Sequence, residues 1–178
     1  DYREYDFDTM EEAQSIQMIK SGANTRIDSE KDATFTSPML IEEIFRQLYE
    51  ATDNNQAINT VLELTAYHFN LDRAYIFEED FDGKVINNTY EWCKKNISEL
   101  KDSSQGLSYS SLGHPYREIF DKEGMFYCKS TSNLPYWQRL LCDHRQAKTI
   151  MQIAMVSNGA FKGFIGFDDC EENRVWPE

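Results

Sequence analysis

The sequence is poor in basic residues and in long apolar stretches. Its 18 lysines and arginines are outnumbered by 31 aspartates and glutamates, which gives a formal net charge of -13. Nucleic acids and anionic membrane surfaces are bound by clustered basic residues, so neither is an expected partner. No apolar stretch approaches the roughly 18 residues that a membrane helix requires, and no signal-peptide pattern is recognisable. We expect a cytoplasmic protein without direct membrane contact.

Cysteine is also scarce and widely spaced. The four cysteines stand at Cys93, Cys128, Cys142 and Cys170, and none forms a CxxC pair. A zinc ribbon or a thioredoxin-type site is therefore not expected. A disulfide framework is typical of smaller, secreted chains. We predict free thiols and no metal site.

Catalytic constellations are missing as well. Each of the three histidines stands alone, and Cys142 and His144 diverge by about 200° on a helix, so they cannot form a nucleophile–base pair. Adjacent residues of a strand point to opposite faces, so Asp168 and Asp169 cannot share a proton or a metal ion. Capping of the strand end is their expected role, with a ligand-facing Asp169 as the alternative. We predict no catalytic residues.

What the sequence does contain is hairpin signals. Residues 148–156 and 161–168 are rich in Ile, Val, Met and Phe, and Asn158-Gly159 between them is the strongest short-range hairpin signal. Glycine weakens a strand, so Gly163 and Gly166 predict the close approach of another backbone or of a ligand. We expect this hairpin at the centre of a sheet.

A second hairpin is predicted over residues 73–79 and 84–92, around Asp82-Gly83. Ala74 and Ile76 alternate with Tyr75 and Phe77, so both faces of this sheet are apolar and covered. Residues 1–36 are expected to be a linker or an N-terminal arm, and 94–111 a loop. The remaining expected elements are helices over 38–51, 54–69, 112–122 and 134–145 and a strand over 125–129. This pattern favours the α+β class, an α/β/α sandwich whose central antiparallel sheet of about six strands has helices on both faces.

Two motifs carry a family resemblance. The segment Gly163 to Cys170 (GFIGFDDC), followed by Arg174 and Trp176, resembles the closing strand of a GAF domain. Upstream, residues 72–78 (DRAYIFE) and 88–93 (NTYEWC) are similar to the first two strands of the same subgroup, which precedes diguanylate cyclase (GGDEF) and histidine kinase outputs in bacteria. The resemblance covers residues 39–176. It implies a GAF domain over 37–178 that lacks its usual last helix and is a piece of a longer protein.

The resemblance also implies a function. GAF domains are regulatory modules, so we expect a bacterial cytoplasmic sensor that is not itself an enzyme. It would bind an unidentified small molecule and control an output domain in the same polypeptide, most often a diguanylate cyclase that makes cyclic-di-GMP. The well-defined ligand subgroups do not match. The bilin-attaching Cys-His pair is absent where Trp137-Gln138 stands, the NKFDE signature of cyclic-nucleotide binding is absent, and the 94–111 stretch lacks the cysteines of methionine sulfoxide reductases.

Ordinary core filling is the favoured explanation of the aromatic residues on the predicted strands, and an apolar pocket is the alternative. By analogy with GAF pockets, the expected ligand-binding residues are Tyr90, Trp92, Trp137, Met151, Ile153 and Asp169. Two other functions stay open. One is a ligandless homodimerisation module that works through helices in 39–69. The other is a small thiol-dependent enzyme, which would need a cysteine of lowered pKa beside a pocket.

Overall fold

The computed structural model describes residues 36–112, 116–134, 139 and 145–175. The chain divides into two compact units, residues 1–70 and 71–178. The first contains two helices and the second contains the sheet. In the described part, no helix is both long and apolar enough to span a bilayer.

Helices α2 (Ser37–Glu50) and α3 (Asn54–Phe69), both predicted from the sequence, lie in the first unit. Proline is tolerated at the start of α2 because its missing N–H has no intrahelical partner there. The Asp53 side chain caps α3 by accepting hydrogen bonds from the backbone N–H groups of Asn55 and Gln56. Leu40 of α2 and Leu64 of α3 are buried together. The two helices therefore pack on each other through their apolar stripes.

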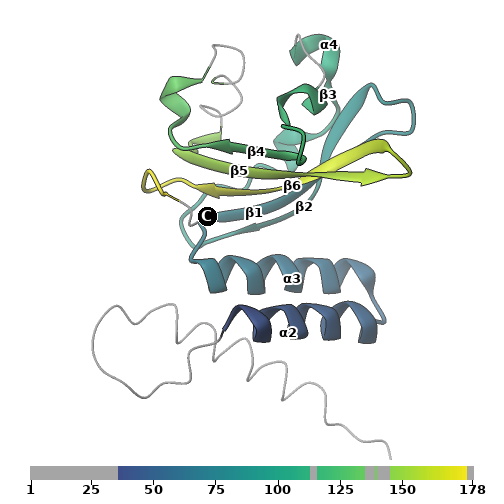
Figure 1. Cartoon of the computed structure of the whole chain (residues 1–178), viewed down its shortest axis with the longest axis vertical. Helices are drawn as coiled ribbons and strands as arrows, with labels where there is room; N and C mark the ends of the chain where they lie inside the picture. Colours follow the sequence, from purple (N-terminus) through teal and green to yellow (C-terminus); the bar gives the residue numbers. More distant parts are fainter. Residues whose placement is uncertain (1–35, 113–115, 135–138, 140–144, 176–178) are drawn as a thin grey trace, which may run out of the picture. The chain divides into compact units, whose positions relative to one another are not determined.

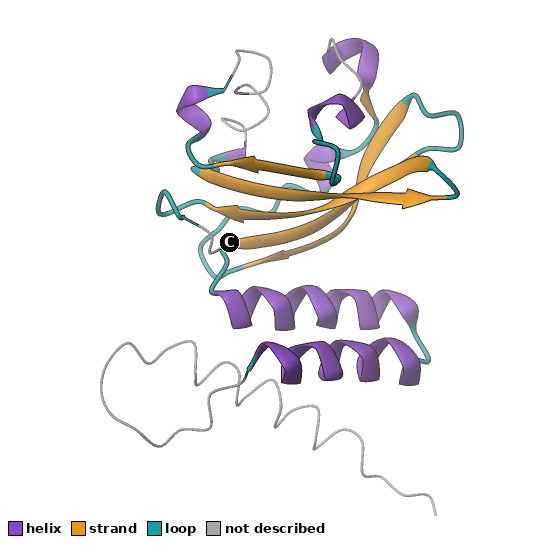
Figure 2. Cartoon of the chain, viewed as in Figure 1, coloured by secondary structure: helices purple, strands orange, loops and turns teal. Residues whose placement is uncertain are grey.

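The second unit is built on one six-stranded sheet in the order β3-β2-β1-β6-β5-β4 (Figure 1). Every neighbouring pair is antiparallel. Short helical turns lie on one side of this sheet (Figure 2). The strands are β1 (Arg73–Glu79), β2 (Val85–Cys93), β3 (Leu107–Ser108), β4 (Met125–Cys128), β5 (Thr149–Ser157) and β6 (Ala160–Asp169). The turns are η1 (Asp102–Ser104), α4 (Tyr109–Leu112), η2 (Tyr116–Ile119) and η3 (Thr131–Asn133).

Both predicted hairpins are confirmed. The β5–β6 turn has positive φ at Asn158 (52°) and Gly159 (76°), the conformation that favours Asn-Gly at this place. The β1–β2 turn likewise has positive φ at Gly83. Strand β6 pairs with β1 on one side and with β5 on the other, so the hairpin indeed contributes a central strand.

The two glycines of β6 are explained by their neighbours. Gly163 has φ of 138°, and a Cβ there would overlap the carbonyl oxygen of Phe77 in β1. A Cβ on Gly166 would overlap the ring of Tyr75. The close approach that the sequence predicts is therefore made by the backbone and a side chain of β1.

Two expectations between the hairpins are wrong in part. Strand β3, which pairs with Val85 and Ile86, lies inside the stretch expected to be loop. A strand of two residues is too short to show an alternating pattern, so the sequence gives no signal for it. In its described part, the predicted helix over 112–122 consists of the last residue of α4 and the 3-10 turn η2. Gly113 and Pro115 interrupt the helical pattern there. The helix expected over 134–145 falls mostly outside the described residues.

The α+β class with a central antiparallel sheet is confirmed. The described residues form six strands, β3 among them, and the described helices lie between the hairpins and before them in the chain. The two faces of β1 are both buried over Ala74, Tyr75 and Phe77, as the apolar alternation predicts.

Candidate functional site

The sheet brings a set of polar side chains onto one of its faces. Arg73 pairs across β1 and β6 with Asp168, and Tyr75 pairs with Gly166, which in turn pairs with Gln152 of β5. Because side chains alternate along a strand, Arg73, Tyr75, Gln152 and Asp168 share one face. We call this the network face.

Asp168 is the centre of the network. Its carboxylate is fully buried. Oδ1 accepts a hydrogen bond from the Tyr75 hydroxyl at 2.8 Å, and Oδ2 accepts one from Arg73 Nη1 at 2.9 Å. Arg145 Nε also donates to Oδ2, at 3.3 Å. One buried carboxylate therefore serves two guanidinium groups and a phenol.

Other groups complete the surroundings of the two arginines. The Arg145 guanidinium lies 3.9 Å from the centre of the Tyr75 ring, a cation–π contact. Glu91 Oε1 lies 3.7 Å from Arg73 Nε, and Glu91 Oε2 accepts hydrogen bonds from the N–H groups of Leu100 and Lys101. Glu91 thus ties the loop after β2 to the charged cluster.

Burial and charge act in opposite directions on the arginines. Burial is the largest single effect and lowers the pKa of Arg73 and Arg145, but the surrounding groups, the Asp168 carboxylate first among them, together outweigh burial and raise both pKa values above the ordinary value. Burial also raises the pKa of Tyr75 well above its ordinary value. Both arginines are therefore charged, and Tyr75 is a neutral hydrogen-bond donor at every physiological pH.

A neutral chain continues from the charged cluster toward the β5–β6 turn. Gln152 Nε2 donates to the Tyr75 hydroxyl at 3.0 Å, and the Tyr116 hydroxyl donates to Gln152 Oε1 at 3.2 Å. The Tyr116 ring stacks on Phe164 with centroids 4.6 Å apart, and Phe164 stacks on Phe77 at 5.0 Å. These rings cover the middle of the network face.

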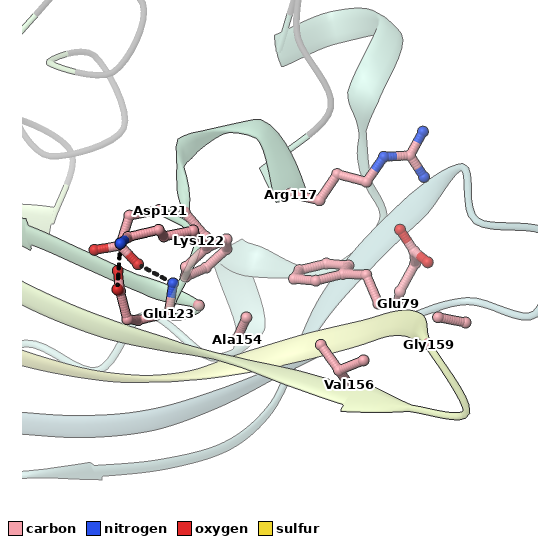
Figure 3. A pocket seen from close by; sticks show the side chains of 12 residues that line it. Glu79, Arg117, Asp121, Lys122, Glu123, Ala154, Val156 and Gly159 are labelled. Atoms are coloured by element: carbon pink, nitrogen blue, oxygen red, sulfur yellow. Dashed lines mark hydrogen bonds and ion pairs between the residues drawn. The ribbon is translucent and has the colours of Figure 1, made fainter.

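Beyond the stacked rings the network face opens into a hollow of about 770 Å³, shown in Figure 3. We call it the hairpin hollow, because one wall is formed by the ends of β5 and β6. Phe120 and Phe161, whose ring centroids are 5.7 Å apart, belong to its apolar part. Charged side chains from β1, η2 and the turn before β4 complete it. The lining residues are Glu79, Arg117, Phe120, Asp121, Lys122, Glu123, Gly124, Ala154, Val156, Gly159, Ala160 and Phe161.

The residues predicted to bind a ligand lie elsewhere. The strand pairing places Trp92 of β2 in the same cross-strand row as Met151 of β5. Tyr90 and Ile153 occupy the next row, on the same face of the sheet. This face is opposite to the network face. Asp169 follows the same alternation, while Trp137 lies outside the described residues. The sheet therefore brings five of the six together, and their role in binding a ligand stays a prediction.

Asp169 has structural partners of the kind expected for a strand-end cap. Its Oδ1 accepts hydrogen bonds from the N–H groups of Glu171 and Glu172, and its Oδ2 accepts one from Arg174 Nε. The predicted separation of the two acidic side chains is also confirmed, since Asp168 is held by Arg73 and Tyr75 on the network face.

Sequence reasoning missed the network and the hollow. Gln152 was the available signal, because a lone amide within an apolar strand needs a buried partner. Arg145 carried no such signal, because its partner Asp168 is fixed only by the pairing of distant strands.

The described thiols do not have the properties of a nucleophile. Cys93, Cys128 and Cys170 are free. Burial is the main cause that raises the pKa of Cys93 to about 11 and of Cys170 to about 12, and it also raises the pKa of Cys128. A nucleophilic cysteine needs the opposite shift, so these three residues give no support to a thiol-dependent enzyme.

Comparison with known proteins gives a sequence relative and similar solved structures. No family model matches the chain. The methanogenesis regulatory histidine kinase FilI of Methanothrix harundinacea is 32% identical over 128 residues, which make up 70% of this chain. The same stretch makes up 14% of the kinase, so the chain spans only a small part of that relative.

Similar structures include domains of phytochromes and the blue-light absorbing form of a PixJ GAF domain. A phycocyanobilin-bound GAF domain from a cyanobacterial phytochrome matches with a TM-score of 0.65 and 13% identity, over 80% of this chain and 84% of that one. The GAF domain of Thermosynechococcus elongatus PixJ matches at 0.58 and 15%, over 72% and 79%. The chromophore-binding domain of Stigmatella aurantiaca phytochrome P1 matches at 0.63 and 14%, over 85% and 58%. Together with the strand order and the two hairpin motifs, these similarities show that the chain has the fold of a GAF domain, the kind found in signalling proteins.

Proposed function

We propose that this domain is the sensory part of a signalling protein, and that it binds a small molecule in the hairpin hollow. The hollow is the observation that carries the proposal. Its volume of about 770 Å³ lies within the range of small-molecule sites, and it combines aromatic walls with a few charged groups. The fold supports the same function, because structures of this fold include domains with a bound chromophore.

The comparisons support control of a histidine kinase better than control of a diguanylate cyclase. The curated relative is named a regulatory histidine kinase, whereas none of the matches described above is a diguanylate cyclase. A ligand can shift such an output only by binding its two states with different affinity. We therefore propose that the ligand changes the equilibrium between two states of an attached kinase.

A bilin does not fit the described part of the network face. Tyr116, Phe164 and Phe77 are stacked on one another in the middle of that face, so their rings occupy the space that a large planar cofactor would need there. The segment containing Trp137-Gln138 also lacks the Cys-His pair to which bilins attach. We therefore propose a smaller ligand for this chain.

A thermal-shift screen of the purified chain against nucleotides, amino acids, tetrapyrroles and metal ions tests the sensory function. A ligand at about 100 times its Kd adds roughly 2.7 kcal/mol to the free energy of unfolding, which is visible as a higher Tm. We expect at least one class of compound to raise the Tm in proportion to the logarithm of its concentration. If no class does so, the domain is not a small-molecule sensor.

Homodimerisation is a second candidate function, and helix α2 favours it. Ile41, Phe45 and Leu48 recur at helical spacing and are 54%, 69% and 48% exposed. An exposed apolar stripe at this spacing is typical of a helix that pairs with a partner helix. We propose that two copies of the chain associate through α2.

Phe45→Glu is expected to convert the dimer to a monomer, because it places a charge in the middle of the apolar stripe. Sedimentation equilibrium measures the change, and we expect the apparent Kd of the dimer to rise at least tenfold. Glu42→Lys, on an exposed polar position of the same helix, is the control and should leave the dimer intact. If the wild-type chain sediments as a monomer at concentrations on the order of 100 micromolar, the homodimerisation function is contradicted.

A further inference from the structure

One wall of the hairpin hollow carries two side chains of opposite charge that do not form an ion pair with each other. Arg117 of η2 and Glu79 of β1 lie on the same side of the hollow, whereas Asp121, Lys122 and Glu123 lie on the other side (Figure 3). No ion pair within 4.0 Å joins Arg117 to any residue that the structure describes. Arg117 thus presents a guanidinium group whose donors are uncommitted.

The remaining charges of the hollow are engaged. Lys122 Nζ lies 3.2 Å from Glu123 Oε1. Asp121 Oδ1 accepts hydrogen bonds from the N–H groups of Glu123 and Met125 and thereby holds the turn before β4. Glu79 uses Oε1 to accept the Tyr109 hydroxyl at 2.9 Å, which leaves Oε2 available. The wall of Arg117 and Glu79 is therefore the part of the hollow able to recognise polar groups of a ligand.

These two groups select the charge of the ligand. The planar guanidinium of arginine presents a fork of donors that matches a carboxylate. A carboxylate such as Glu79 matches an ammonium group. A ligand with a large negative charge, such as a nucleotide, is disfavoured because Glu79, Asp121 and Glu123 surround the hollow and the whole chain carries a net charge of -13. A molecule with one charge of each sign satisfies both groups at no net charge.

The apolar part of the hollow selects the body of the ligand. Phe120 and Phe161 present their rings to it, and Ala154, Val156 and Ala160 add small apolar surface. Phe120 also packs against the buried Phe164 at 5.9 Å. The rings are thus held in place by the core and form a preformed surface for an apolar group.

We propose that the hairpin hollow binds a zwitterionic small molecule with an apolar body, of which an α-amino acid with an apolar side chain is the simplest example. Arg117 binds its carboxylate, Glu79 binds its ammonium group, and the side chain lies against Phe120 and Phe161. The inference rests on the proposed sensory function and adds to it the chemical class of the signal.

Isothermal titration of the chain with L-leucine, L-methionine and L-phenylalanine tests this assignment. Two truncated probes separate the charges: isocaproate lacks the ammonium group of leucine, and isoamylamine lacks its carboxylate. We expect at least one of the three amino acids to bind, and each truncated probe to bind at least tenfold more weakly than leucine.

The variants Arg117→Gln and Glu79→Gln provide the second test. Loss of a charge-assisted pair is expected to weaken binding of the amino acid by about 10- to 100-fold in each. The amide of Glu79→Gln can still accept the Tyr109 hydroxyl, so the fold should be kept, which circular dichroism checks. Lys162→Gln is the matched control: it removes one positive charge at an exposed position outside the hollow and should change the affinity less than twofold.

The outcomes separate this inference from the sensory function on which it rests. If a nucleotide or another class of compound binds and no amino acid does, the sensory function stands and the zwitterion assignment is wrong. The assignment is also wrong if an amino acid binds Arg117→Gln as tightly as Lys162→Gln. If no compound of any class binds, both proposals fail.

Discussion

Asp168→Asn is expected to lower the free energy of unfolding by about 3 to 5 kcal/mol, the cost of breaking a buried ion pair by removing one partner. The carboxylate is fully buried and accepts hydrogen bonds from Arg73, Arg145 and Tyr75. An asparagine keeps the size of the side chain but leaves two buried guanidinium groups without their shared counter-charge. Urea unfolding followed by tryptophan fluorescence measures the change.

Two further variants serve as controls for the Asp168→Asn result: one at the surface, Asp82→Asn, and one with a smaller expected effect, Tyr75→Phe. Asp82→Asn makes the same chemical change where the side chain is 64% exposed and 3.8 Å from Lys84, so it should cost less than about 1 kcal/mol. Tyr75→Phe removes the hydrogen bond to Asp168 and the one accepted from Gln152, and should cost about 1 to 3 kcal/mol. It keeps the test informative if Asp168→Asn does not fold. An Asp168→Asn chain within 1 kcal/mol of wild type would mean that the cluster is solvated.

The hairpins could be predicted because their signals are local. Asn158-Gly159 indicates a hairpin because a two-residue turn requires positive φ at both positions. Asp53 indicates a helix start because its side chain can accept hydrogen bonds from the free N–H groups of the first helical turn. The motif around Gly163 and Gly166 also indicated the family fold before any pairing was known. Elements whose geometry is decided within about ten residues were therefore predicted with nearly correct bounds.

The network face could not be predicted because it depends on pairing between distant strands. Arg73 and Asp168 are 95 residues apart, and they meet only because β1 lies beside β6. Arg145 and Tyr116 reach the same face from segments with no strong periodicity. Tyr90, Trp92, Met151 and Ile153 were named by analogy with GAF pockets, and the strand pairing places them on one face. Nothing in the alternation says which face carries a hollow.

Gly163→Ala is the second variant with a large expected effect, about 2 to 6 kcal/mol of lost stability. Two causes combine. Gly163 has φ of 138°, a conformation that L side chains rarely adopt, and such backbone strain costs of order 1 to 3 kcal/mol. The new Cβ would also overlap the carbonyl oxygen of Phe77 in the neighbouring strand, and overpacking typically costs a further 1 to 3 kcal/mol. A backbone atom cannot move aside as a flexible side chain can, so β1 and β6 must separate locally.

Gly159→Ala distinguishes these two causes in the same hairpin. Gly159 also has positive φ, at 76°, but no atom lies within 4 Å of a Cβ built there. This control should therefore show the cost of the backbone conformation alone, about 1 to 2 kcal/mol. Urea unfolding of both variants gives the difference, which is the cost of the contact with Phe77 together with the additional strain of φ at 138° over φ at 76°. Equal losses in the two variants would mean that β6 can move away from β1 at no cost, and the tight approach of these central strands would then not be what requires glycine at this position.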